Sequence, residues 1–80
     1  MTQEQIKDSL QAIFDSVFLD SVVITPELSA QDVEEWDSLL QISIIVAVEK
    51  KFGIKFRTGE VERTNNVGEF IEVISKRLKA

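Results

Sequence analysis

One serine in the middle of the chain could do chemistry, but the sequence lacks the groups that would make it catalytic. Ser38 lies in the tripeptide Asp37-Ser38-Leu39 and follows the acids Glu34 and Glu35. The sequence contains no histidine or cysteine, so it has no imidazole base for serine, no thiol nucleophile and no nitrogen or sulfur ligand for zinc. Carboxylates are poorly suited to activate serine at neutral pH. We therefore expect a protein that is not an enzyme and has neither catalytic residues nor a metal site.

The same tripeptide has an ordinary structural interpretation. Ser38 and Gln41 are three residues apart, the spacing of a capping box that satisfies free backbone N–H groups at the start of a helix. Judged by its position alone, Ser38 is best explained as a helix cap. Its surroundings indicate a role beyond capping. Acidic residues before the serine, an apolar stripe on the helix beside it and a chain of only 80 residues occur together.

The charge and length of the chain limit what it can bind. Fourteen acids against nine bases give a formal charge of −5, and a chain without a basic surplus is poorly suited to nucleic acid. Residues 1–40 carry nine acids and one base, so the partners should be proteins with basic surfaces. No apolar run approaches the ~20 residues of a membrane span or the pattern of a signal peptide. We expect one cytoplasmic, monomeric domain over residues 1–80 with no membrane insertion.

The helical spacing of the apolar residues predicts an all-α fold, a small four-helix bundle with three long helices and one short one. A long loop at residues 19–37 separates the first two helices, and it either carries function or hides a short helix begun by Thr25 and Pro26. The long helices are expected at residues 2–18, at 38–52 and from 66 onward, and the short third helix at 60–63 after a linker at 54–59.

The second long helix has apolar residues on two sides. Ile44 and Val48 lie on the side that forms the stripe needed for a bundle core. Leu39, Ile42 and Val46 cluster on roughly the opposite side. Either the long loop covers this second stripe, or the stripe is an exposed docking surface for a partner. The two interpretations differ in whether Ile42 and Val46 are accessible to solvent.

The run Trp36-Asp37-Ser38-Leu39-Leu40-Gln41-Ile42 and the helix that follows it to Ile54 resemble the modification site and second helix of the acyl carrier protein family, which includes peptidyl carrier domains. The resemblance covers nearly the whole chain. In that family the serine of the Asp-Ser-Leu motif is esterified by 4′-phosphopantetheine from coenzyme A. The resemblance therefore implies this cofactor on Ser38, flanked by Asp37 and Leu39, with acyl or aminoacyl groups carried as thioesters on the cofactor's thiol.

The resemblance also implies partners and a surface that binds them. The partners are a phosphopantetheinyl transferase, a ligase that loads acyl or aminoacyl groups, and downstream transferase or synthase enzymes. Acids near the motif would steer basic partner surfaces, although Glu34 and Glu35 are equally well explained as solvated loop charges. The expected partner-binding residues are Glu34, Glu35, Leu39, Ile42, Val46 and Glu49.

The chain departs from the pattern of fatty-acid carriers, which tend to have a small residue before the motif and several acids along the second helix. Here Trp36 precedes the motif and only Glu49 remains, so we expect a carrier for a dedicated biosynthetic pathway. Trp36 should pack the loop onto the core. Asp37 either repels the phosphate or caps the helix.

The sequence leaves open the kind of cargo and an alternative function. The cargo could be aminoacyl, short acyl or fatty acyl, because the sequence does not show whether the core leaves room for a long chain. The alternative function is a non-catalytic helical interaction module, or a carrier-like protein that no longer accepts the cofactor, in which Ser38 is only a cap. Whether the core has room for a long acyl chain depends on five residues, which are Ile13, Phe14, Ile45, Ile71 and Ile74.

Overall fold

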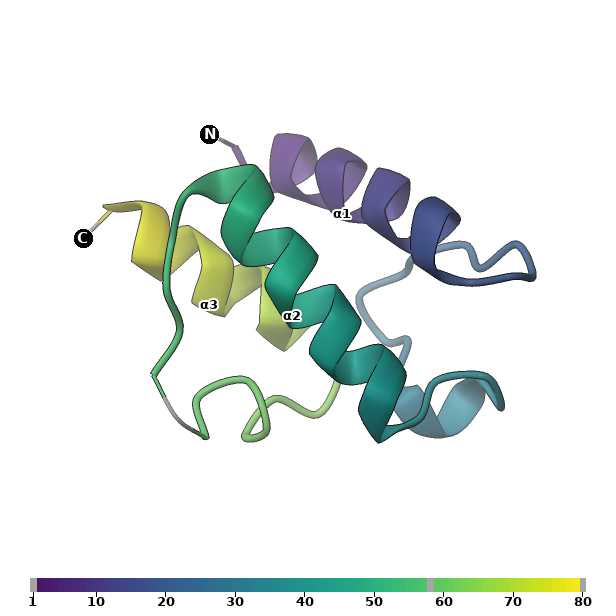
Figure 1. The fold of residues 1–80 in the computed structure, drawn as a ribbon. Helices are drawn as coiled ribbons and strands as arrows, with labels where there is room; N and C mark the ends of the chain where they lie inside the picture. Colours follow the sequence, from purple (N-terminus) through teal and green to yellow (C-terminus); the bar gives the residue numbers. More distant parts are fainter. Residues whose placement is uncertain (1, 58, 80) are drawn as a thin grey trace.

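The regular elements of the computed structural model, which describes residues 2–57 and 59–79, are all helical. Helix α1 packs against both α2 and α3, and α2 and α3 begin at the end of the molecule opposite to the start of α1 (Figure 1). The all-α prediction is confirmed. The elements of the described chain are α1 at Gln3–Val17, the 3-10 turn η1 at Ala30–Asp32, α2 at Ser38–Phe52 and α3 at Val67–Lys79.

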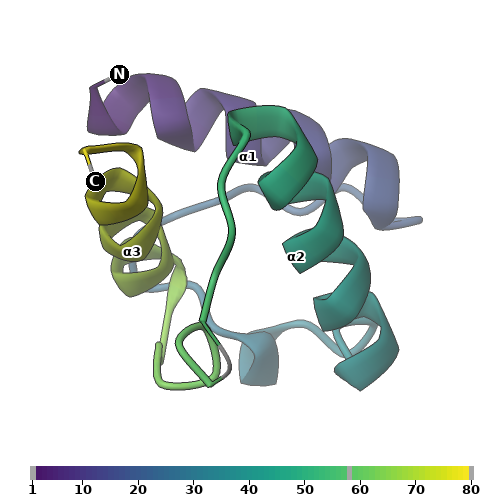
Figure 2. The ribbon, with the colours of Figure 1, turned by 60° about the vertical axis from the view of Figure 1, so that its left-hand side comes forward.

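The short third helix expected at residues 60–63 is a pair of turns in the structure. The Glu60 N–H donates to the Arg57 carbonyl and the Thr64 N–H donates to the Val61 carbonyl, each at 3.0 Å. A stretch of four residues gains too few hydrogen bonds to offset the cost of nucleating a helix. The bundle therefore has three α-helices among its described residues. Figure 2 shows the connection between α2 and α3 running between these helices; Thr58 of the predicted linker lies outside the described residues.

The helix ends follow local signals in the sequence. Thr2 and Gln5 form a capping box, in which each side chain accepts a hydrogen bond from the backbone N–H of the other, at 3.1 and 2.9 Å. The Asn66 side chain accepts from the Glu69 N–H at 2.9 Å and caps α3. Gly53 ends α2 with φ of 66°, a left-handed conformation that other residues adopt only with strain.

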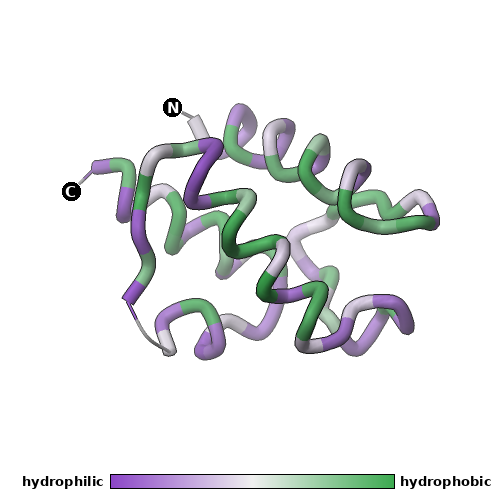
Figure 3. The backbone as a smooth tube through the Cα atoms, in the orientation of Figure 1, coloured by the Kyte–Doolittle hydropathy of each residue, from purple (hydrophilic) through white to green (hydrophobic). Residues whose placement is uncertain are grey.

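The core lies where the three helices meet. Ile6, Leu10 and Phe14 of α1 are fully buried, and Ile44 and Val48 of α2 face them. Figure 3 shows more hydrophobic colour along α2 than along α1, where hydrophobic and hydrophilic colours alternate within each turn. α1 thus has one apolar side. α2 has apolar residues on its buried side and also outside it.

The long loop between α1 and α2 is held by hydrogen bonds at several points. The Gln11 side chain donates to the Val22 carbonyl at 2.7 Å and accepts from the Ile24 N–H at 2.8 Å. The Gly68 N–H donates to the Pro26 carbonyl at 2.9 Å, and a Cβ on Gly68 would meet that oxygen at 3.1 Å. The short helix predicted at Pro26 is a turn, and η1 begins four residues later.

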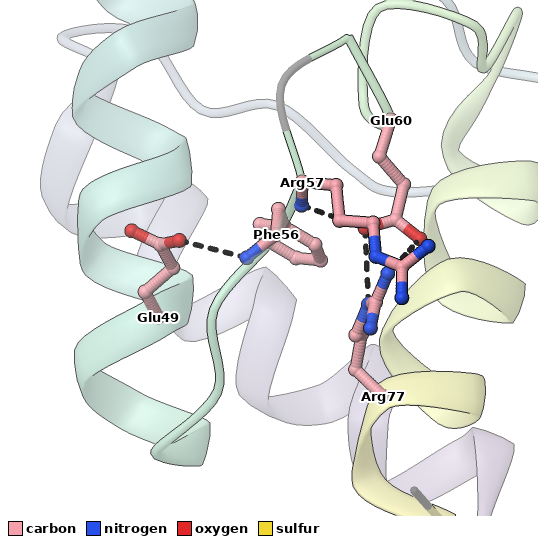
Figure 4. A network of polar contacts seen from close by, with 5 residues as sticks. All are labelled: Glu49, Phe56, Arg57, Glu60 and Arg77. Atoms are coloured by element: carbon pink, nitrogen blue, oxygen red, sulfur yellow. Dashed lines mark hydrogen bonds and ion pairs between the residues drawn. The ribbon is translucent and has the colours of Figure 1, made fainter.

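A bidentate ion pair ties the connection between α2 and α3 to the side of α3 (Figure 4). Arg77 donates from Nε and Nη2 to the two carboxylate oxygens of Glu60, at 3.0 and 2.8 Å. The Arg57 N–H donates to the same carboxylate at 3.0 Å. On the other side, the Phe56 N–H donates to the Glu49 carboxylate of α2 at 2.9 Å. The connection is therefore anchored to both helices.

We expect Glu60→Gln to lower the free energy of unfolding at pH 7, and the difference from the wild type to vanish in acid. The Arg77 guanidinium, together with the Arg57 N–H, holds the pKa of the Glu60 carboxyl below its usual value. The carboxylate therefore stabilises the fold above the ordinary glutamate pKa of about 4.3, and this stabilisation is lost as the pH falls through the lower folded-state pKa. The same contact raises the pKa of Arg77, which stays charged throughout.

Urea unfolding of Glu60→Gln and the wild type, from pH 7 into acid, measures the difference in their free energies of unfolding. Glu62→Gln is the matched control, since Glu62 is an exposed glutamate two residues away. The same pH dependence in both variants would show that the ion pair does not stabilise the fold.

Candidate functional site

Ser38 is the first residue of α2, and Asp37 before it is the cap. The Asp37 carboxylate accepts a hydrogen bond from the Leu40 N–H at 2.9 Å, while its backbone has the extended conformation of an N-cap residue. Ser38 is exposed, and its hydroxyl has no hydrogen-bond partner among the described residues. The capping role that position suggested for Ser38 is therefore wrong. The cap belongs to Asp37, and the hydroxyl of Ser38 is left accessible.

Gln41, which the sequence paired with Ser38, has a different partner. Its side-chain oxygen accepts from the indole N–H of Trp36 at 2.6 Å. The Trp36 ring in turn meets Phe14 and Phe18 edge-on, with ring centroids 5.2 and 5.8 Å apart. The prediction that Trp36 packs the loop onto the core is confirmed. This aromatic cluster and the Gln41 contact fix the approach of the loop to Ser38.

A cleft of about 620 Å³ opens beside Ser38. Its floor is apolar, formed by Val61, Val67 and Phe70, and each of these residues is buried. Hydroxyl and amide side chains form much of its wall. α2 and α3 both begin at this end of the molecule (Figure 1), so residues distant in the sequence line the same cleft. The polar residues that line the cleft are Ser29, Gln31, Asp37, Ser38, Gln41, Glu62, Thr64, Asn65 and Asn66.

The acids proposed from the sequence have different surroundings. Glu34 is exposed and makes no hydrogen bond to the described residues. Glu35 accepts from the Leu19 N–H at 2.7 Å and from the Asp20 N–H at 3.4 Å, so it holds the loop after α1. Glu49 holds the connection after α2 through the Phe56 N–H. Glu35 and Glu49 therefore have structural roles, and only Glu34 is a simple solvated charge.

The second apolar stripe of α2 is accessible to solvent. The exposed fractions of Leu39, Ile42 and Val46 are 76%, 58% and 44%. The interpretation in which the long loop covers this stripe is therefore wrong. Three large apolar side chains at successive turns of one helix give α2 an unpartnered face that begins one residue after Ser38.

Sequence reasoning missed most of the cleft. Gln41 was noticed only as a possible partner of Ser38, and Val61 and Phe70 were assigned to helices without a place near the serine. No local pattern marks these residues, because the chain reversal between α2 and α3 brings them to Ser38. The two apolar residues of the predicted linker, Ile54 and Phe56, are the one signal that the connection returns to the core.

No protein-family model matches the sequence. Individual proteins do match it along most of its length. The chain is 30% identical to an acyl carrier protein of Acidothermus cellulolyticus, over 94% of this chain and 90% of the relative. It is 33% identical to the meromycolate extension acyl carrier protein of Mycolicibacterium smegmatis, over 94% of this chain and 77% of that protein. The chain belongs to the acyl carrier protein family.

The fold agrees with this assignment. The solution NMR structure of a holo acyl carrier protein from Geobacter metallireducens superposes with a TM-score of 0.77 at 36% identity, covering 98% of this chain and 86% of that one. The protein is thus a non-catalytic carrier, and its family implies a phosphopantetheine group and enzymes of the synthase and transferase classes as partners. No helix in the described part of this carrier is long and apolar enough to cross a membrane.

Proposed function

We propose that this carrier holds 4′-phosphopantetheine on Ser38 and presents acyl or aminoacyl thioesters to the enzymes of a dedicated biosynthetic pathway. The observation that supports the site is the accessible hydroxyl of Ser38 at the first position of α2, with the capping task taken by Asp37. A hydroxyl used as a cap would have to give up its hydrogen bond before it could be modified. Ser38 makes no such bond to any of the residues that the structure describes.

The surroundings of Ser38 fit a phosphodiester. The start of α2 offers free backbone N–H groups and the positive end of the helix dipole, which favour a negative group. Asp37 shares this end of the helix, so a phosphate there would lie beside a like charge and be pushed toward solvent. When bound, the cofactor supplies the reactive thiol that this cysteine-free chain lacks.

The modification itself needs no base from this chain. The Ser38 oxygen forms a bond to the phosphorus that bears pantetheine, and the pyrophosphate bond of coenzyme A breaks. The hydroxyl proton is released, and 3′,5′-adenosine diphosphate leaves. A phosphopantetheinyl transferase must activate the hydroxyl, because this carrier has no histidine or cysteine to do so. The role of this chain is to present Ser38 in an exposed and fixed position.

The exposed stripe of Leu39, Ile42 and Val46 is the proposed docking surface for partner enzymes. It begins one residue after Ser38 and would bring a partner within reach of the modified serine. Glu34 lies before the motif and adds a negative charge free to steer a basic surface. The scarcity of acids along α2 supports a set of partners different from those of bulk fatty-acid synthesis. The cytoplasmic location and the monomeric state stay predictions.

Intact mass spectrometry tests the function directly. The folded protein is incubated with coenzyme A, Mg²⁺ and a broad-specificity phosphopantetheinyl transferase, and its mass is measured before and after. We expect a single phosphopantetheine adduct. Absence of an adduct with several transferases would overturn the proposal and leave a helical interaction module, or a carrier that has lost its cofactor.

We expect variants of the docking surface to separate apolar from charged recognition by the transferase. Glu34→Lys should slow modification at low salt and much less at high salt, because steering by exposed charges is screened. Ile42→Ser should slow modification at every salt concentration, because it removes apolar contact area. Initial rates of adduct formation at both salt concentrations measure the two effects.

Glu34 is preferred to Glu35 for this experiment, since Glu35 also holds the backbone of Leu19 and Asp20. Val23→Ser is the matched control for Ile42→Ser, because Val23 is 74% exposed on the loop and not on α2. A salt-independent effect of Glu34→Lys, or an equal loss of rate in Val23→Ser, would contradict this view of the surface.

A further inference from the structure

Most exposed lysines of the chain gather at the end of the molecule opposite to Ser38. Because α2 and α3 begin at the same end, their C-terminal ends also share an end, beside the start of α1 (Figure 1, Figure 2). Both helices carry bases in their last turn, and a further lysine follows in the connection after α2. We call this surface the basic end, and its exposed residues are Lys50, Lys51, Lys55, Lys76 and Lys79.

The basic end has few acids to balance it. Residues 50–57 and 73–79 contain seven bases and no acid. The acids that border these two stretches are Glu49, whose carboxylate is engaged by a backbone N–H of the connection, and Glu72, which is exposed. Arg77 is paired with a glutamate of the connection, whereas none of the five lysines forms an ion pair with a described residue. The lysines are thus available to a partner.

The helix dipoles explain only part of this arrangement. A lysine in the last turn of a helix interacts favourably with the partial negative charge of that end, which amounts to about half a charge. Two helix ends therefore offset about one of the five positive charges. The start of α1, with Glu4, Lys7 and Asp8, offsets one more. A positive excess remains, and Lys55 lies outside both helices.

Ser38 and the basic end are too far apart to act as one site. From Ser38 to Lys51, α2 rises about 20 Å, since an α-helix rises ~1.5 Å per residue. Exposed charges are screened over about 8 Å at physiological ionic strength. The acids before Ser38 therefore do not cancel the positive potential of the basic end. A partner bound there would also leave the Ser38 hydroxyl uncovered.

The chemistry of the basic end suits an acidic protein segment better than a lipid surface. Stable binding to a lipid surface combines lysines with apolar side chains that enter the headgroup layer. The exposed large apolar residues in the described part of the chain lie in the loop after α1 and on α2 before its last turn. They are Leu19, Val23, Leu39, Ile42 and Val46. An extended acidic segment needs no such anchor, and it can follow lysines that come from three separate segments.

We infer that the basic end is a second binding surface, which takes an acidic segment of a partner protein. The contact is made by charge, so it is weak and reversible. It would hold the carrier beside its enzymes while the start of α2 stays accessible. This use of the surface rests on the proposed attachment of the cofactor to Ser38, whereas the binding itself does not.

Titration of the unmodified carrier with a fluorescein-labelled decaglutamate peptide tests the surface. Fluorescence anisotropy gives the Kd, and backbone amide NMR shifts of the carrier locate the contact. We expect shifts in the last turns of α2 and α3 and at Lys55, and none at the start of α2. The affinity should fall about tenfold from low salt to physiological salt, because ion pairs between exposed charges are screened.

Two paired variants test whether both helix ends contribute. Lys50→Gln with Lys51→Gln removes the charges of α2, and Lys76→Gln with Lys79→Gln removes those of α3. Each pair should weaken peptide binding about fivefold, because it removes two exposed ion pairs. Arg63→Gln is the matched control, since Arg63 is an exposed base outside the basic end and should change the affinity by less than about twofold. Circular dichroism checks that the variants fold.

Absence of peptide binding at low salt would overturn the inference. Lysine-dependent binding to vesicles of phosphatidylserine and phosphatidylcholine, without affinity for the peptide, would assign the surface to lipid instead. An equal loss of affinity in Arg63→Gln, or shifts centred on the start of α2, would show that the contact lies elsewhere. Because the titration uses the unmodified carrier, it can succeed when no phosphopantetheine adduct forms, so failure of the inference and failure of the proposed function are distinguishable.

Discussion

Ser38→Ala is expected to fold like the wild type and to gain no phosphopantetheine. The effect on modification is all or none, because the substitution removes the only oxygen at this position that could bond to phosphorus. The effect on the fold should be small, since the Ser38 side chain is exposed and the Leu40 N–H is capped by Asp37. Circular dichroism and thermal unfolding check the fold, and intact mass after incubation with transferase checks the modification.

Ser43→Ala is the matched control for this prediction. Ser43 is also an exposed serine on α2, and its hydroxyl donates to the Leu39 carbonyl one turn earlier, at 3.3 Å. We expect this variant to accept the cofactor as the wild type does. An adduct on Ser38→Ala, or a loss of modification in Ser43→Ala, would place the attachment elsewhere on the helix.

The helices could be predicted because their ends depend on neighbouring residues. The capping box of Thr2 and Gln5, the left-handed Gly53 and the Asn66 cap each involve groups within a few positions of one another. The apolar repeat then assigns the buried face of each helix. These signals are local, and the structure contains each of them.

The exact start of α2 shows the limit of such local signals. Asp37 and Ser38 are both good capping residues, and a capping-box pattern with Gln41 favoured the serine. In the structure the cap is Asp37, and the Gln41 side chain accepts from the Trp36 indole N–H at 2.6 Å and is not part of a capping box. The partner of Gln41 thus depends on the path of the loop, which a local capping pattern does not contain.

The cleft and the anchored connection could not be predicted, because they depend on contacts between distant segments. Glu49 and Glu35 look like surface acids in the sequence, yet each accepts a backbone N–H from another segment. The Phe56–Phe70 contact likewise joins residues on either side of a chain reversal. The family resemblance gives the position of the serine, whereas the space available beside it follows only from the packing.

Phe14→Ala is expected to lower the free energy of unfolding by about 3–5 kcal/mol, which is a large share of the 5–15 kcal/mol of a typical small domain. Phe14 is fully buried in α1, and its ring contacts both Phe18 and Trp36. The alanine variant loses the buried ring, leaves a cavity and breaks two aromatic contacts. Urea unfolding followed by circular dichroism measures the loss.

Leu19→Ala is the control, because Leu19 is 94% exposed and its truncation should change stability by no more than about 0.5 kcal/mol. Equal stability of Phe14→Ala and Leu19→Ala would show that the core is not packed as described. Phe14→Leu keeps most of the buried volume and should remain folded. Because Phe14 supports the Trp36 ring beside Asp37 and Ser38, this milder variant should also be modified more slowly than the wild type, which links the packing of the core to the presentation of the serine.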